Sequence, residues 1–153
     1  MTFYANLNYN ASLDVRDLSV LSERIQQEPP GGTVWLLVAP RRGRKTWTLR
    51  GLERILPVDR AKFLDIQGEY GLHKLPEVTP EHGYYFLLDE AHAILKNPDL
   101  GLQLVTRCGA LHARGARVIM AVTPAECQLL LDYGQHRGHV STKAIIGIAP
   151  LSL

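Results

Sequence analysis

Short apolar runs alternate with helical patterns along most of the chain. Four of the runs have the length of a strand and lack the alternation of polar and apolar residues that a half-exposed strand shows. They are therefore expected to be strands covered on both faces, and a fifth run lies near the C-terminal end. The five predicted strands cover residues 33–39, 61–66, 84–88, 116–122 and 143–148.

Apolar residues that recur three or four positions apart predict helices between these strands. The first helix contains Leu18, Leu21 and Ile25, with Asp14 as a candidate cap, and Pro and Gly at positions 29–32 end it. Three further helices are predicted over residues 45–56, 100–113 and 124–133.

This alternation of strands and helices predicts an α/β fold, a three-layer sandwich in which helices cover both faces of a five-stranded, mostly parallel sheet. We expect residues 1–30 to form an N-terminal helical extension packed on the core. Residues 31–153 are expected to form the α/β domain itself.

Composition narrows the class of protein. A chain of 153 residues with 46% hydrophobic content and a net charge of +2 is expected to fold as one domain and not to be disordered. Two cysteines without a spacing pattern argue against a disulfide framework and a zinc knuckle. No apolar run approaches the roughly 18 residues of a membrane span, and no signal peptide is recognised, so we expect a cytoplasmic protein.

The residues after the first strand carry the first candidate chemistry, because ligands of parallel α/β sheets bind beyond the carboxyl ends of the strands. A phosphate loop reads G-x-x-x-x-G-K-[ST], and Lys45 and Thr46 stand where it requires them. Ala39 and Arg44 replace its two glycines. The alternative is a basic surface turn. The candidate nucleotide-binding residues are Ala39, Pro40, Arg41, Arg42, Gly43, Arg44, Lys45, Thr46 and Trp47.

Two carboxylates follow the third apolar run. In phosphoryl-transfer enzymes an aspartate at this place holds Mg²⁺, and a neighbouring glutamate can orient or deprotonate water. Asp89 and Glu90 are the candidates here, while the alternative is a pair that begins a helix and complements its dipole. We expect His92 to pack against the motif around Glu90 or to hydrogen-bond with it.

Thr123 follows the fourth strand and precedes Pro124. A polar side chain at this place can sense the outer phosphate, and a threonine before a proline can equally cap the next helix. The two roles are compatible.

Together these residues resemble the core of P-loop ATPases that carry an additional catalytic glutamate. The segment Pro40-Arg41-Arg42-x-x-Lys45-Thr46 resembles the G-P-R-R-x-G-K-T loop of the archaeal-type and signal-transducing ATPases related to the AAA+ group. The resemblance covers roughly residues 33–153. Those ATPases continue into a helical lid, which this chain is expected to lack.

The resemblance implies a protein that binds ATP with Mg²⁺ and hydrolyses it slowly or with a partner. Lys45 would contact the phosphates, Thr46 and Asp89 would hold the metal, Glu90 would position water, and Thr123 would sense the outer phosphate. Turnover is expected to need an arginine supplied by a protein partner or a second copy, because added positive charge stabilises the transition state.

Two alternatives stay open. In the first, the nucleotide site has decayed and the fold serves as an adaptor or regulatory subunit that acts through protein–protein contacts. In the second, the protein acts on DNA, since residues 89–92 and 107–116 are similar to a stretch of DNA-pumping and conjugation ATPases and of related phage assembly proteins. Trp47 would pack on the loop or meet a nucleotide base, and Cys108 with His112 could offer two metal ligands.

Overall fold

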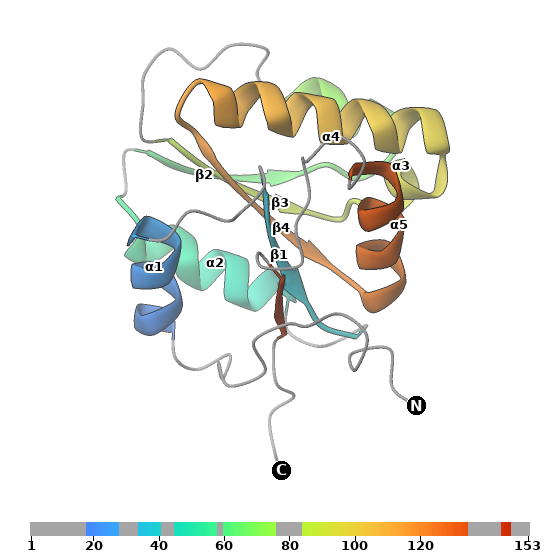
Figure 1. The fold of residues 1–153 in the computed structure, drawn as a ribbon. Coiled ribbons are helices and arrows are strands. Elements are labelled where there is room, and N and C mark those ends of the chain that lie inside the picture. The colour runs from blue at the N-terminus through green and yellow to red at the C-terminus, as the bar shows by residue number, and fades with distance from the viewer. Residues whose placement is uncertain are drawn as a thin grey trace.

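The computed structural model describes residues 18–27, 34–40, 45–57, 60–75, 84–134 and 145–147, and Figure 1 shows their arrangement. Helices and strands alternate along this part of the chain, except that α3 is followed directly by α4. In order, the elements are α1 (Leu18–Gln27), β1 (Val34–Val38), α2 (Lys45–Ile55), β2 (Ala61–Asp65), the 3-10 helix η2 (Glu69–Lys74), β3 (Tyr85–Asp89), α3 (His92–Lys96), α4 (Pro98–Ala113), β4 (Arg117–Val122), α5 (Pro124–Gly134) and β5 (Ile145–Gly147).

The described strands form one sheet in the order β2-β3-β4-β1-β5, and every neighbouring pair is parallel. Strands β1 to β4 are five or six residues long and form the body of the sheet. The last strand, β5, covers only three residues and pairs with β1, whereas the sequence predicts a strand over residues 143–148. The predicted α/β fold with a parallel sheet and flanking helices is confirmed.

The sheet is buried on both faces, which explains why its strands lack alternation. All five residues of β1 are buried. Val34, Leu36 and Val38 join one apolar cluster with residues of η2, α3, α4 and α5, whereas Trp35 and Leu37 join a second cluster with residues of α1 and α2. In Figure 1, α1 and α2 accordingly lie below the sheet and α4 lies above it.

Helix α1 lies against α2 and the sheet as an amphipathic helix. Leu21 and Ile25, spaced four residues apart, are buried in the second cluster. At the end of the helix the guanidinium of Arg117 on β4 donates a hydrogen bond of 2.5 Å to the carbonyl of Ile25. A cation at this place satisfies a free carbonyl and complements the helix dipole. The division of the chain into residues 1–30 and 31–153 stays a prediction.

Two short elements are absent from the hydrophobic pattern, namely η2 and α3. In addition, α4 begins at Pro98 and not near residue 100, because Asn97 caps it. The Asn97 side chain accepts hydrogen bonds from the amides of Asp99 and Leu100 at 3.0 and 3.3 Å. Proline suits the first helical position that follows such a cap.

Within the part of the chain that the structure describes, none of the helices is both long and apolar enough to cross a membrane.

Candidate functional site

The first turn of α2 meets the end of β3 at the carboxyl edge of the sheet. The Thr46 hydroxyl donates a hydrogen bond of 2.5 Å to Oδ2 of Asp89, across 43 residues of sequence. Helix α2 can reach β3 because it connects β1 to β2 and packs across β4 and β3 on the way. The fold therefore brings together the two residues that the sequence predicts as magnesium ligands.

Asp89 is a buried acid, only 4% exposed. Its Oδ2 accepts from the Thr46 hydroxyl, and its Oδ1 accepts from the backbone amide of Glu90 at 3.0 Å. Both donors are neutral, whereas a buried carboxylate is most stable when a cation balances its charge. A divalent cation beside Oδ2 would supply that balance.

Lys45 is the first residue of α2, and its side chain turns back toward β1. The Lys45 ammonium donates to the carbonyls of Pro40 and Ala39 at 3.0 and 3.4 Å. This contact joins the residues on the two sides of the loop at positions 41–44. Arg41, Arg42, Gly43 and Arg44 lie outside the described residues.

Ala39 stands where the phosphate loop has its first glycine, and the backbone accepts alanine there. Ala39 is fully buried, and its amide donates to the carbonyl of Val122 at 3.1 Å, extending the contact between β1 and β4. It is not among the residues with positive φ. The missing glycine therefore introduces no backbone strain at this position.

Glu90 follows Asp89 with a φ of +63°, which makes it the only residue other than glycine with positive φ in the described ranges. Such a conformation is uncommon for a glutamate and is found mainly where the surroundings fix it, often at functional sites. The side chain is 42% exposed, and its Oε2 lies 3.3 Å from Nδ1 of His92. The expected contact of His92 with this motif is thus present.

Thr123 caps α5. Its hydroxyl accepts from the amide of Glu126 at 3.3 Å, and the Glu126 carboxylate accepts from the amide of Thr123 at 3.2 Å. This reciprocal pair is a capping box, completed by Pro124 at the first helical position. The hydroxyl proton stays available to donate, so a sensing role for Thr123 stays a prediction.

Three other candidates can now be placed. Trp47 is 47% exposed, so it does not pack into the core. Cys108 is buried, and burial raises the pKa of its thiol to about 12. No group of three or more His, Cys, Asp or Glu side chains that could hold a metal occurs among the described residues, so Cys108 and His112 do not form a metal site with others there.

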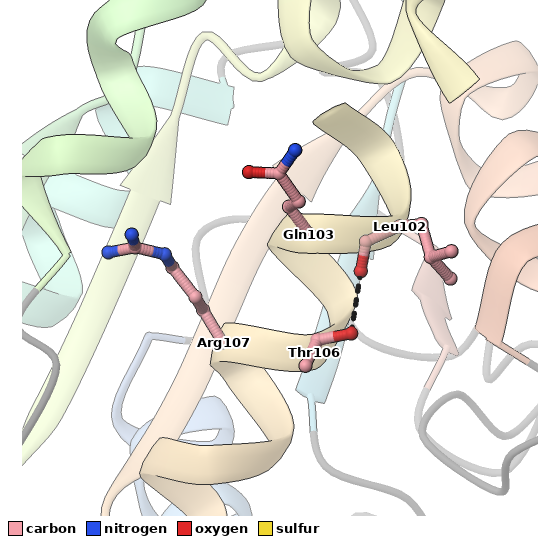
Figure 2. Close-up of a pocket in the computed structure, with 4 residues that line it drawn as sticks. All are labelled: Leu102, Gln103, Thr106 and Arg107. Atoms are coloured by element: carbon pink, nitrogen blue, oxygen red, sulfur yellow. Dashed lines mark hydrogen bonds between the residues drawn. The ribbon is translucent and has the colours of Figure 1, made fainter. Parts of the chain in front are cut away.

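A hollow of about 290 Å³ lies on α4, a feature that the sequence does not predict. Leu102, Gln103, Thr106 and Arg107 line it, and Figure 2 shows that all four project from this one helix. Arg107 donates to the carbonyls of Leu72 and Leu75 and so holds η2 against α4. The hollow lies on the face of the sheet opposite α2.

Comparisons with known proteins support the fold in outline. No protein-family model and no curated protein matches the chain. Among solved structures, it is similar to the Orc1 protein of Aeropyrum pernix in complex with DNA, with 14% identity and a TM-score of 0.53 over 94% of this chain. The match covers 47% of that protein, so the chain spans about half its length. This likeness supports a P-loop-like α/β fold in its coarse features.

Proposed function

We propose that the chain is a P-loop ATPase core that binds ATP with Mg²⁺ and hydrolyses it slowly or with the help of a partner. Residues 31–153 would form the ATPase-like domain and residues 1–30 its helical extension. The observation that carries the proposal is the hydrogen bond between Thr46 and Asp89. It joins the two motifs that P-loop enzymes use to hold one magnesium ion.

The donor set suits Mg²⁺. This ion prefers oxygen ligands and is held by one or two protein oxygens together with water and phosphate oxygens. The Thr46 hydroxyl and the Asp89 carboxylate offer such oxygens 2.5 Å apart, in a buried place that favours a balancing cation. Bound Mg²⁺ would neutralise charge that develops on the phosphates.

Lys45 and the amino end of α2 would bind the phosphates. Helix α2 has 11 residues, and its amino end carries the positive end of the helix dipole. The Lys45 ammonium lies over the loop carbonyls, where it needs only to exchange them for phosphate oxygens. The arginines of the loop would add local positive charge.

Glu90 would orient or deprotonate the attacking water, as a half-exposed carboxylate beside a magnesium ligand can do. An arginine from a protein partner or a second copy would stabilise the transition state.

Thermal melting tests binding. With Mg²⁺-ATP at 100 times its dissociation constant, the free energy of unfolding should rise by about 2.7 kcal/mol, which corresponds to about 5 to 10 °C in melting temperature. Lys45→Ala should remove the shift, and Lys96→Ala, at an exposed lysine of α3, should keep it. Glu90→Gln should keep the shift and stop hydrolysis.

Absence of any shift at millimolar nucleotide would refute the ATPase proposal and favour an adaptor that acts through protein contacts. A DNA-binding role remains a separate prediction. It is drawn from the arginines at positions 41, 42 and 44 and from the similarity of residues 89–92 and 107–116 to DNA-pumping and conjugation ATPases. It requires binding to a DNA fragment that weakens steeply as salt is raised.

A further inference from the structure

The turn between β3 and α3 fixes two polar side chains beside each other. Asp89 ends the strand, Glu90 has left-handed backbone, Ala91 is buried, and His92 begins α3. Because Ala91 is anchored in the core, the backbone on both sides of it has little freedom. The turn therefore fixes the positions of Glu90 and His92 relative to each other.

The character of this contact depends on whether Nδ1 of His92 carries a proton. An ionised carboxylate only accepts hydrogen bonds, so an Nδ1 lone pair 3.3 Å from Oε2 of Glu90 would be repelled. With Nδ1 protonated, the contact is attractive. It occupies one carboxylate oxygen and leaves Oε1 to accept from another group.

We propose that His92 is a positioning residue that holds Oε2 of Glu90 so that Oε1 faces the attacking water. This inference rests on the proposed function, since it concerns how the same site is organised for hydrolysis. The Glu90 side chain is 42% exposed and would sample several rotamers if no neighbouring group held it. Holding one oxygen reduces that freedom before ATP binds.

Substitutions of His92 separate positioning from simple packing. His92→Ala should lower kcat for ATP hydrolysis about tenfold or more, because this is the usual effect of losing a partner that orients a reacting group. The same variant should leave KM and the melting shift with Mg²⁺-ATP unchanged. His92→Asn should restore much of the rate, because its amide nitrogen lies as many bonds from Cβ as Nδ1 does. His92→Gln displaces that nitrogen by one carbon and should not restore it. His73→Ala, at an exposed histidine of η2, is the control.

A nuclear magnetic resonance measurement examines the contact without nucleotide. The imidazole ¹⁵N spectrum of the free protein should show a protonated Nδ1 on His92, with the signal assigned by its loss in His92→Asn. Glu90→Ala should shift that signal and leave those of the other histidines in place.

The outcomes separate the two proposals. An unprotonated Nδ1, a His92→Ala enzyme with the wild-type kcat, or an Asn variant no faster than the Ala variant would each overturn the role of His92. A wild-type protein that binds no Mg²⁺-ATP would overturn the proposed function, and the ¹⁵N spectrum would still decide whether His92 holds Glu90.

Discussion

Strands β3 and β4 are neighbours in the sheet. Asp89 is the last residue of β3 and Thr123 directly follows β4, yet these two polar residues at the same edge are used differently. At the end of β3, Asp89 is buried and accepts a hydrogen bond from Thr46, 43 residues away in sequence. After β4, the Thr123 hydroxyl accepts from Glu126, three residues away.

The difference lies in the range of the contact. A local contact such as that of Thr123 stabilises the start of a helix, and it would do so in any protein with this turn. A contact that joins distant segments and buries an acid costs desolvation, which a purely structural role would not require. The end of β3 is therefore the better candidate for chemistry, and the following predictions examine this contrast.

The largest expected effect is on binding of Mg²⁺-ATP at the end of β3. Asp89→Ala should remove the magnesium-dependent part of the stabilisation by ATP, up to about 2.7 kcal/mol at 100 times the wild-type dissociation constant. Thr123→Ala should keep it. Melting curves with ATP in Mg²⁺ and in a chelator measure this, with Asp132→Ala, at an exposed residue of α5, as the control. Equal losses in the Asp89 and Thr123 variants would contradict the contrast.

A smaller effect is expected on the stability of the free protein when the cap of α5 is removed. Thr123→Ala should lower the free energy of unfolding by about 1 kcal/mol, because the Glu126 amide loses its acceptor. Thr123→Ser should retain most of the wild-type stability. Urea unfolding gives both values, and an unchanged midpoint in the alanine variant would argue against the cap.

The smallest effect is expected for the other half of the capping box. Glu126→Gln should change stability by less than about 0.5 kcal/mol, because the amide oxygen can still accept from the Thr123 amide. A loss as large as that of Thr123→Ala would show that the charge of Glu126 matters more than its geometry. The same urea experiment compares the two.

The sequence predicts the layers of this fold well because burial on both faces produces continuous apolar runs. It also predicts Thr46 and Asp89 as partners of one metal, since their motifs have fixed places at strand ends. The sequence also contains a signal that favours the capping role of Thr123, because a threonine followed three positions later by a glutamate is a capping-box signature.

Other features have no local signal. The left-handed backbone of Glu90 is set by the tertiary surroundings and not by residue type, which would favour glycine or asparagine there. The contacts of Lys45 with Ala39 and Pro40 depend on how the loop closes. The short helices η2 and α3 are too brief for a hydrophobic period to reveal them.

The central claim is that Thr46 and Asp89 act as one magnesium site, and a double-mutant cycle on ATP affinity tests it most directly. Calorimetric titration of wild type, Thr46→Val, Asp89→Asn and the double variant, each with Mg²⁺ and with chelator, gives the coupling. We predict that either single change weakens Mg²⁺-ATP binding about tenfold or more. The double variant should bind no more weakly than the weaker-binding single variant. In chelator, all four proteins should bind ATP with the same affinity. Losses that simply multiply, or a dependence on Mg²⁺ that survives in the double variant, would contradict the claim.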